Sequence, residues 1–431
     1  MKSSSSSDAP TVPPRLWIVL RRVGLVQYDA DEDLIPSLKV AKPPHFSSLT
    51  TPTKAPRPSD DGAEHPYVVA ANDAGLLLYV SRTTSVRFDL DPNPRGMLFV
   101  LALAQARDLL PADTATGRGA SACTTITVRV PDRVRPEQSR ISTIKSVGLL
   151  PIPGTGGSDY VVAELLVADR ASLLTFRSGM DSWDERELTC PLVSGTCPRW
   201  TPHDVISHDG NLWWVDLRQG LLCCDPIAYN PVLHYVELPE MFALEFRSEK
   251  EEQIDSYRIV RVSNGRLRFV DVALARESIS TPRETLVVVW TLAFVPSIGK
   301  ASWEDHEFVM TTLAKIWEDD SYRRTGMPQE VPVLALVHPH NPDVVYFFLQ
   351  GYLFSVDVRH SAVVEFAREP YSDLVQVIDR PVIDWRYVLA WVLPPVASQC
   401  LNDSQDKDVA PAEACQSPAP SSDLTDKNES T

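Results

Sequence analysis

The sequence predicts an all-β protein, built from antiparallel sheets that follow one another along the chain. The first observation is residues 200–239, where apolar β-rich runs are separated by tight turns at Asp209-Gly210 and at Gly220. Two such turns are a strong hairpin signal, and four strands of this length form one antiparallel sheet. The second observation is that the same alternation of apolar run and polar turn recurs from Tyr67 onward. The third is the composition, 36 prolines and 18 glycines, because frequent proline disfavours long helices.

In the first half of the chain, a strand is predicted at 17–20, directly after a short proline-rich stretch. Residues 29–66 are predicted to be loop, because they carry repeated proline, serine and charged residues with few apolar runs. Hairpins are predicted at 67–80 and at 160–178, each with a polar bend between two apolar runs. Between these hairpins, the proline- and glycine-bearing stretch 111–157 is predicted to be a long irregular loop.

In the second half, residues 257–272 contain Asn264-Gly265, a pair suited to a two-residue type I′ turn. The β-branched run 286–294 is continuous, as expected for an inner strand. Residues 308–317 fit either a strand or one face of a helix, and two adjacent threonines favour the strand. Further strand blocks are predicted at 343–366 and 384–393.

The net charge of the chain argues against a nucleic-acid partner. Lys and Arg total 41 against 57 Asp and Glu, which gives a formal net charge of −16. An acidic surface repels the phosphate backbone, and basic residues such as Arg15, Arg21 and Arg22 are too sparse for a nucleic-acid surface. We therefore expect no nucleic-acid binding.

The chain ends and the cysteines indicate the cellular compartment in which the protein is expected. Residues 1–13 and the acidic segment 397–431, which has no aromatic residue, are predicted to be disordered. The start lacks an apolar signal-peptide core, and the longest apolar stretch, 286–295, is shorter than the ~20 residues of a membrane helix. The seven cysteines include no C-x-x-C pair, which suits a reducing compartment. We expect a cytoplasmic or nuclear protein with no membrane association.

The run WTPHDVISHDGNLWWVDLRQGLLCCDP, followed by PVLHYVELP, resembles the hallmark segment of a large plant family expanded in grasses, domain of unknown function 1618. Further pieces that resemble the family are YVVAANDAGLLLY, DYVVAELLV, VSNGRLRFVDV, VVVWTL, KIWEDDSYR and DVVYFFLQGYLFSVDVRHSAVVEF, and together they cover residues 14–396. The resemblance implies a propeller-like domain, similar in style to the kelch-type domains that follow F-boxes. It brings no established activity and no catalytic residues. Residues 1–60 show no compact amphipathic helical block where an F-box would lie.

The candidate polar cluster is His203, Asp204, His208 and Asp209, which spell H-D-x-x-x-H-D. Its spacing fits no standard zinc pattern, and the two histidines can face opposite sides of a strand-turn-strand unit. The alternative is a turn in which the aspartates accept hydrogen bonds from loop amides. No metal, no other cofactor and no catalytic residue is predicted.

Tryptophans and cysteines are further candidates for contact or ligand sites. Trp183 and Trp303 lie among charged residues and are the candidates for exposed contacts, whereas Trp213, Trp214, Trp290 and Trp385 are predicted to pack in the core. Cys223 and Cys224 are adjacent, so on a strand they point to opposite faces, and buried thiols are favoured over zinc ligation.

These observations predict one propeller-like domain over residues 14–396 with about six or seven antiparallel blades. The expected function is a non-enzymatic protein-interaction scaffold whose loops contact a protein partner, with a plant ubiquitin-ligase or stress-response adaptor as one form of it. The alternative is a small-ligand binder or hydrolase that uses the central channel. Carboxylates or histidines at one channel mouth would favour the alternative, and an apolar plug would favour the scaffold.

Overall fold

The computed structural model describes most of the chain between residues 15 and 395. The described ranges are 15–30, 35–54, 66–80, 96–105, 123–132, 143–156, 158–168, 170–192, 200–239, 254–273, 284–295, 300–368 and 385–395. The predicted disordered ends, 1–13 and 397–431, lie outside the described residues.

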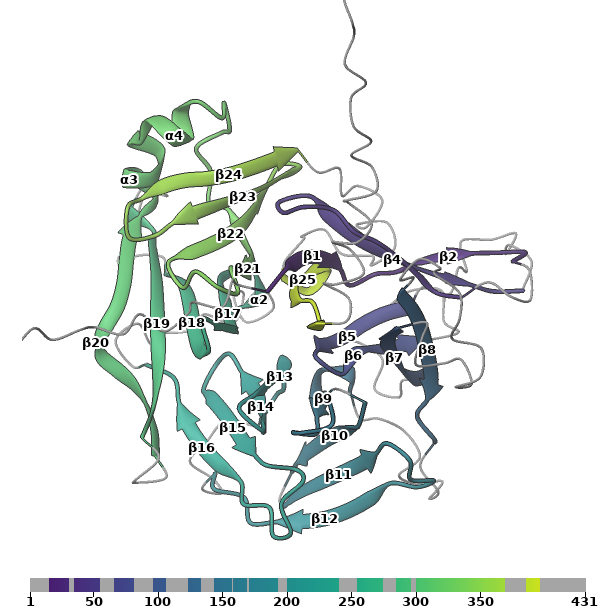
Figure 1. The fold of residues 1–431 in the computed structure, drawn as a ribbon. Helices are drawn as coiled ribbons and strands as arrows, with labels where there is room; N and C mark the ends of the chain where they lie inside the picture. The colour runs from purple at the N-terminus through teal and green to yellow at the C-terminus, as the bar shows by residue number, and fades with distance from the viewer. Residues whose placement is uncertain are drawn as a thin grey trace, which may run out of the picture.

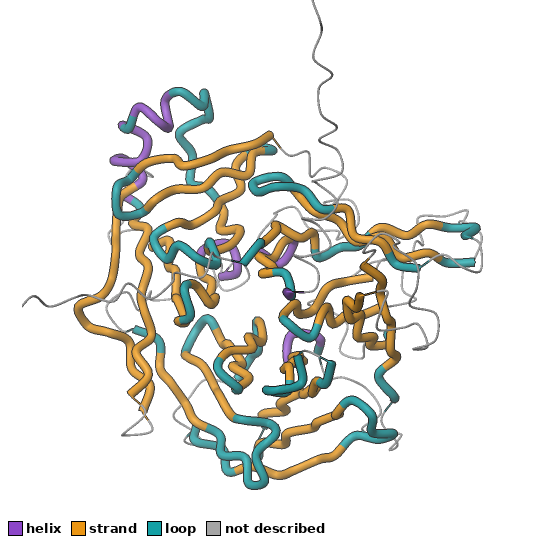
Figure 2. Tube along the Cα trace, viewed as in Figure 1, coloured by secondary structure: helices purple, strands orange, loops and turns teal. Residues whose placement is uncertain are grey.

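In the part of the chain that the structure describes, regular structure is mostly β-strand, and the strands form six sheets arranged in a ring (Figures 1 and 2). Five of the sheets are four-stranded and antiparallel, and each is built from four strands consecutive in the chain. Their strands are β5 (Pro66–Asn72), β6 (Gly75–Val80), β7 (Met97–Gln105) and β8 (Cys123–Arg129); β9 (Val147–Pro151), β10 (Tyr160–Val167), β11 (Ala171–Arg177) and β12 (Asp184–Leu188); β13 (Asp204–His208), β14 (Asn211–Asp216), β15 (Gly220–Cys224) and β16 (His234–Glu237); β17 (Arg258–Ser263), β18 (Arg266–Ala273), β19 (Leu286–Val295) and β20 (Lys300–Thr312); and β21 (Val333–Val337), β22 (Val344–Leu349), β23 (Tyr352–Asp357) and β24 (Ala362–Arg368).

The sixth sheet joins the two ends of the chain. It contains β1 (Trp17–Arg21), β2 (Leu25–Gln27), β3 (Ser37–Lys39), β4 (Phe46–Pro52) and β25 (Val388–Val392). The C-terminal β25 pairs antiparallel with β1, whereas β4 runs parallel to both β1 and β2. The prediction of six or seven antiparallel blades is therefore not confirmed: five blades are regular, and the closing sheet has a mixed topology.

One strand of each sheet lies at the centre of the ring. The first strands of the regular blades, β5, β9, β13, β17 and β21, each contact the next, and β25 lies between β21 and β5. Since every regular blade is ordered outward from its first strand, these six strands surround the centre of the ring (Figure 1), which is where a propeller has its central channel. The arrangement is a β-propeller, as predicted.

Apolar side chains fill the wedges between neighbouring blades, so most strands are buried on both faces. One core cluster joins the blades from β13 to β24, and a second joins the closing sheet to its neighbours on both sides. Trp213, Trp214 and Trp290 are buried in these clusters and in the one between β9–β12 and β13–β16, which confirms their prediction as core. Inter-blade packing therefore holds the channel strands in place.

Several hairpins lie where the sequence places them. The turn between β17 and β18 is Asn264-Gly265, and both residues have positive φ (48° and 69°), as a type I′ turn requires. The strands of residues 200–239 form one four-stranded antiparallel sheet, as predicted.

Two predicted loops contain strands. Residues 29–66 include β3 and β4, and β4 has the sequence FSSLTTP, whose serines and threonines resemble loop composition. Residues 111–157 include β8, the one-turn 3-10 helix η3 (Ile144–Ser146) and β9. In β4, the buried Ser47 accepts a hydrogen bond from the backbone N–H of Ala41 (2.9 Å), so a contact across the β3–β4 connection satisfies a polar group that the composition assigned to solvent.

The predicted strand 308–317 is wrong in its second half. The strand β20 ends at Thr312, and the helix α3 (Leu313–Glu318) follows. Thr312 has extended backbone geometry, and its hydroxyl accepts a hydrogen bond from Lys315 N, which makes it an N-cap. The remaining helices are short: α2 (Ile254–Tyr257), α4 (Asp320–Arg323) and the 3-10 turn η6 (Trp385–Tyr387). None of the helices in the described ranges is long and apolar enough to span a bilayer.

Candidate functional site

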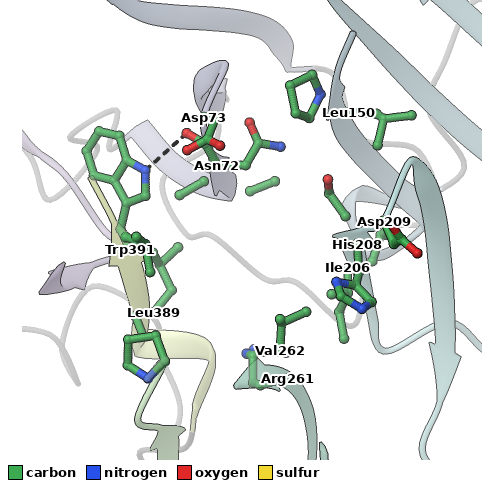
Figure 3. Close-up of a pocket in the computed structure, with 18 of the residues that line it drawn as sticks. Asn72, Asp73, Leu150, Ile206, His208, Asp209, Arg261, Val262, Leu389 and Trp391 are labelled. Atoms are coloured by element: carbon green, nitrogen blue, oxygen red, sulfur yellow. Dashed lines mark hydrogen bonds between the residues drawn. The ribbon is translucent and has the colours of Figure 1, made fainter. Parts of the chain in front are cut away.

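A cavity of about 640 Å³ lies at one mouth of the central channel, and all six inner strands or the loops that leave them contribute to its wall. Figure 3 shows side chains from several strands surrounding an open centre, with Trp391 and Leu389 on one side and Ile206 and His208 across from them. Its volume lies within the range of about 300–1,000 Å³ that is usual for small-molecule sites.

Apolar groups make up most of the wall. They include Val69, Leu150, Ile152, Val205, Ile206, Val262, Val337, Leu389, Trp391 and Val392. At the rim, the Trp391 indole N–H donates to the carbonyl of Asn72 (3.2 Å), and the Asn72 side-chain amide donates to the carbonyl of Leu149 (2.7 Å). These bonds tie β25, β5 and β9 together, so this part of the wall is held by hydrogen bonds as well as by packing (Figure 3).

Two arginines and one aspartate form the base of the cavity, and we call them the base trio: Arg22, Asp204 and Arg261. Arg261 Nη1 lies 2.5 Å from Asp204 Oδ2, and Arg22 Nη2 lies 3.7 Å from the same oxygen. The three side chains are 14%, 6% and 11% exposed for Arg261, Arg22 and Asp204. All three are therefore charged groups held in a largely desolvated place, where electrostatic interactions are stronger than in water.

Each member of the base trio is positioned by the fold. The backbone N–H of Arg22 donates to the carbonyl of Tyr387 (2.8 Å), and its carbonyl accepts from Val68 N (2.7 Å). Asp204 is the first residue of β13, and Arg261 lies in the middle of β17. The trio thus joins the end of β1 to two blades on the far side of the channel.

A buried network continues behind the trio. Arg22 Nη1 donates to the Tyr67 hydroxyl (3.3 Å), which donates to the carbonyl of Arg386 (3.0 Å). The Arg386 guanidinium in turn lies 2.8 Å from Asp255, and both of these side chains are buried. Burial raises the pKa of the Tyr67 hydroxyl, so this group stays protonated and acts as a donor.

The rim of the cavity is more exposed. Arg15 and Asp73 form an ion pair of 2.6 Å in which both side chains are about half exposed. His208 is half-buried, and desolvation is the main reason that its pKa lies below the ordinary value. Asp209 is exposed and adopts a positive φ of 49° in the turn that leads to Gly210.

The predicted polar cluster is divided by the structure. Asp204, His208 and Asp209 line the cavity, whereas His203 lies outside its lining. Within the described residues, no group of three or more His, Cys, Asp or Glu side chains is placed to hold a metal ion.

His203 belongs to a separate structural contact. Its Nδ1 accepts from the backbone N–H of Leu217 (3.3 Å) and lies 3.7 Å from Asp216. Desolvation by burial lowers the pKa of His203, and the Asp216 carboxylate also accepts hydrogen bonds from Thr201 N and the Gln219 amide. This residue stabilises the β14–β15 turn.

The two tryptophans predicted to be exposed are not freely exposed. Trp303 is buried, so that expectation is wrong; its indole donates to the carbonyl of Glu237 (2.6 Å) and its ring packs near Phe269. Trp183 is partly buried, and its indole donates to the carbonyl of Pro131 (2.7 Å). In both cases the polar N–H finds a backbone acceptor on a neighbouring blade or loop, which the charged sequence context does not reveal.

The adjacent cysteines are buried, as predicted. Cys223 and Cys224 lie in the central part of their blade, and burial raises the pKa of each thiol to about 12. Such thiols stay protonated and are poor nucleophiles.

Sequence reasoning missed the two arginines of the base. In the sequence, Arg22 is one of a few sparse basic residues, and no motif marks Arg261. The available signal was their position: Arg22 follows the apolar strand β1, and Arg261 interrupts the apolar strand RIVRVS. A charged residue within an otherwise buried strand is usually paired, and its partner becomes visible only in the tertiary structure.

A ring of sheets whose innermost strands surround a channel places this chain in the β-propeller class. Residues 214–346 match the family model described as "Protein of unknown function (DUF1618)", which confirms the predicted resemblance over that segment. No curated protein matches the sequence.

Three solved structures show weak similarity to this chain. Apo AztD from Citrobacter koseri is 11% identical, with 72% of this chain and 76% of that chain covered and a TM-score of 0.32. The Cps50 (Swd1) β-propeller domain of Myceliophteria thermophila is 11% identical, with coverage of 72% and 88% and a TM-score of 0.27. An apocarotenoid oxygenase mutant from Synechocystis is 8% identical, with coverage of 71% and 58% and a TM-score of 0.28. At these scores and identities the similarities support no conclusion about this chain.

Proposed function

We propose that this protein is a non-enzymatic propeller that binds a small ligand in the cavity at the mouth of its channel. The observation that supports this proposal is the convergence of all six inner strands on one cavity with apolar walls and a buried charged base. Small-molecule sites commonly combine a mostly apolar lining with a few well-placed polar groups. An open mouth with charged groups supports a ligand binder. A channel plugged by apolar side chains would have supported a protein scaffold instead.

Binding is favoured over hydrolysis by the geometry of the lining. Ser207 and His208 are neighbours in β13, and successive side chains of a strand point to opposite faces. The histidine is therefore directed away from the serine hydroxyl that it would have to activate.

A cavity-filling substitution tests the proposal. Val262 points into the cavity from β17 (Figure 3), so Val262→Trp places an indole in the ligand volume. The matched control is Val364→Trp on the outermost strand β24, where Val364 is 58% exposed. Wild type and both variants would be screened by thermal shift against a library of small metabolites.

We expect compounds that raise the melting temperature of wild type and Val364→Trp but not of Val262→Trp. Ligand binding to the native state raises its stability by mass action, so a filled cavity removes the shift. A library without any stabilising compound, or compounds that stabilise Val262→Trp equally, would contradict the proposal.

A protein-recognition role is the second candidate, and exposed apolar residues on one edge strand favour it. Val364 and Phe366 alternate along β24 and are 58% and 48% exposed. This surface is a candidate contact for the protein partner expected of a kelch-like, F-box-associated adaptor in a plant ubiquitin-ligase or stress-response assembly. Affinity purification would compare wild type with the Val364→Asp/Phe366→Asp variant, and a stoichiometric partner retained equally by both would exclude this surface.

A further inference from the structure

The charged side chains of the base trio are engaged with other groups of the protein. Arg261 Nη1 contacts the Asp204 carboxylate at 2.5 Å and also donates to the carbonyl of Val260 (2.7 Å). Arg22 lies 3.7 Å from the same carboxylate and donates to the Tyr67 hydroxyl (3.3 Å). The base trio therefore already has partners within the protein and does not depend on a ligand to supply them.

The base trio also presents little surface to the open volume. All three side chains are largely buried, and Arg22 Nε and Arg261 Nη2 are shielded from solvent. Since an atom that borders an open cavity is accessible to solvent, these atoms of the two guanidinium groups face the protein interior. A ligand in the cavity therefore meets few of the charged atoms of the trio.

The other charged side chains of the lining lie at its rim. Arg15 and Asp73 are paired with each other at 2.6 Å. Asp209 is exposed at the tip of the β13–β14 turn. An ion pair between a ligand and Asp209 would be open to solvent, and such pairs contribute little to affinity. Among the described residues that line the cavity, the rim thus offers no strong site for a charged group.

The surface that does border the open volume is mainly apolar. Ile152, Val262, Ala390 and Val392 line the cavity and are each half-buried, so each keeps part of its surface accessible. They lie in β17 and β25 or directly after β9, so this apolar surface comes from three of the six sheets. An apolar ligand would remove the surface from water, which is favourable.

His208 is a polar side chain of the wall that remains available for a hydrogen bond. The Trp391 indole N–H is used by the carbonyl of Asn72, whose side chain donates to the Leu149 carbonyl and accepts from Ala74 N (2.9 Å). His208, by contrast, makes no side-chain hydrogen bond to any residue in the described ranges. Desolvation lowers its pKa, so the ring is neutral at neutral pH and has one donor and one acceptor nitrogen.

We propose that the ligand of this cavity is an uncharged, largely apolar molecule with one hydroxyl or amide group, which contacts His208 while the apolar body lies against Ile206, Val262 and Leu389. This inference rests on the proposed function and names the ligand class of that site. Figure 3 shows these four residues around the same open centre. A hydroxyl or an amide both donates and accepts, so it matches the neutral imidazole.

A charged head on the same molecule is disfavoured by this wall. Burying an ion removes its hydration, and the loss is recovered only where the ion meets an opposite charge and further hydrogen bonds. The base trio is held by protein partners, and the exposed Asp209 offers only a weak pairing. The cavity therefore selects against the carboxylate and the amine of the same skeleton.

The experiment measures binding of matched probes to the full chain by isothermal titration calorimetry at neutral pH. One set is octanol, octanamide, octanoate and octylamine, and the second set carries the same four head groups on a phenylbutyl chain. We expect the alcohol or the amide of at least one set to bind about 10-fold or more tightly than the carboxylate and the amine of that set, because the charged heads lose hydration that the wall does not replace.

Three variants test the contact with His208. His208→Phe keeps a ring but no hydrogen-bonding group, and we expect it to weaken the alcohol or the amide about 2–10-fold, the value of one net hydrogen bond. His208→Gln keeps a donor and an acceptor and should restore part of this loss. The control is His234→Phe on the outermost strand β16, where the side chain is exposed, and its affinity should stay within about twofold of wild type. Circular dichroism of each variant separates loss of binding from loss of folding.

The possible failures can be told apart. A carboxylate or an amine that binds as tightly as the neutral probes of its set would overturn the choice of an uncharged ligand. If the neutral probes are preferred but His208→Phe binds them as wild type does, the contact with His208 is wrong. If no probe binds, the inference about ligand class fails, and the metabolite screen with Val262→Trp then decides the proposed function independently.

Discussion

At the level of single residues, Asp204 is the side chain on which the base of the cavity depends. Its Oδ2 is approached by both Arg22 and Arg261, and its Oδ1 accepts from the backbone N–H of Val205 (2.9 Å). A buried carboxylate that serves two arginines is costly to remove, because its loss leaves two desolvated positive charges side by side.

We therefore predict that Asp204→Asn lowers the free energy of unfolding by about 3–5 kcal/mol, the cost of removing one partner of a buried ion pair. The matched control is Asp209→Asn in the same hairpin, at an exposed position with a positive φ that asparagine tolerates. Urea denaturation should show a change below about 0.5 kcal/mol for the control. Equal stability of the two variants would contradict the role given to the base trio.

A second residue couples stability to pH. His338 Nδ1 accepts hydrogen bonds from the backbone N–H groups of His340 and Asn341, both at 3.0 Å. These bonds require that Nδ1 carries no proton, so they favour the neutral imidazole. Burial lowers the pKa of His338 from 6.5 to about 4, and the neighbouring His340 contributes less to the same shift. The unfolded chain therefore binds this proton more readily than the folded one.

The sign of the pH dependence follows from linkage. The stability contributed by neutral His338 is fully present above about pH 6.5 and is lost as the pH falls toward about 4. His338→Asn keeps an acceptor near the position of Nδ1 but cannot titrate in this range. Although the variant should be less stable at pH 8, because it loses the ring contact with Trp17, it should lose less stability than wild type between about pH 7 and pH 5. If the free energy of unfolding of wild type and of His338→Asn changed equally with pH in chemical denaturation, His338 would not be the group that couples stability to pH.

At the level of elements, the close approach of neighbouring inner strands depends on one small residue. A Cβ at Gly148 of β9 would lie 2.5 Å from Val205 Cγ1 of β13 and 3.0 Å from a methyl group of Leu212. The two strands belong to adjacent blades and both line the channel, so this contact sets how closely the blades pack.

We predict that Gly148→Ala destabilises the protein by about 1–3 kcal/mol through overpacking. Val205→Ala removes the methyl group that the new Cβ would meet, so the double variant Gly148→Ala/Val205→Ala should be less destabilised than the sum of the two single variants. A double-mutant cycle by urea denaturation measures this coupling, and strict additivity would mean that the new methyl group at residue 148 does not press on Val205.

At the level of the whole molecule, the ring is closed by strands from opposite ends of the chain. The pair β1–β25 joins residues 17–21 to residues 388–392, and Arg22 N donates to Tyr387 O next to this pair. Closure also brings Arg386 to Asp255 in a different blade. An open ring would leave the inner strands β5 and β21 exposed along one side.

Truncation tests the closure. A chain ending at residue 384 lacks η6 and β25, and we predict that it loses the single cooperative unfolding transition and binds a hydrophobic dye, because β1, β5 and β21 lose their neighbour. The control ends at residue 396, after β25, and should keep the wild-type melting transition. A cooperative transition in the shorter chain would show that the five regular blades are stable without closure.

The local pattern of the chain was enough to predict its class and many of its elements. Period-two runs with turns such as Asn264-Gly265 predicted antiparallel hairpins, because turn chemistry and alternation act over a few residues. Strands such as β4 were missed, since their serines and threonines resemble loop composition and their parallel backbone pairing with β1 and β2 leaves no local turn signal in the sequence.

The site shows the same division. Asp204, His208 and Asp209 stood out as a polar cluster in the sequence, and all three line the cavity. The sequence does not reveal that Arg22 and Arg261 meet at Asp204. Arg22 follows β1, Asp204 begins β13 and Arg261 lies in β17, so 182 residues separate the first pair and 57 the second. The hairpins and the all-β class were therefore encoded locally, whereas the closure of the ring, the channel-mouth cavity and its charged base exist only once distant strands are packed side by side.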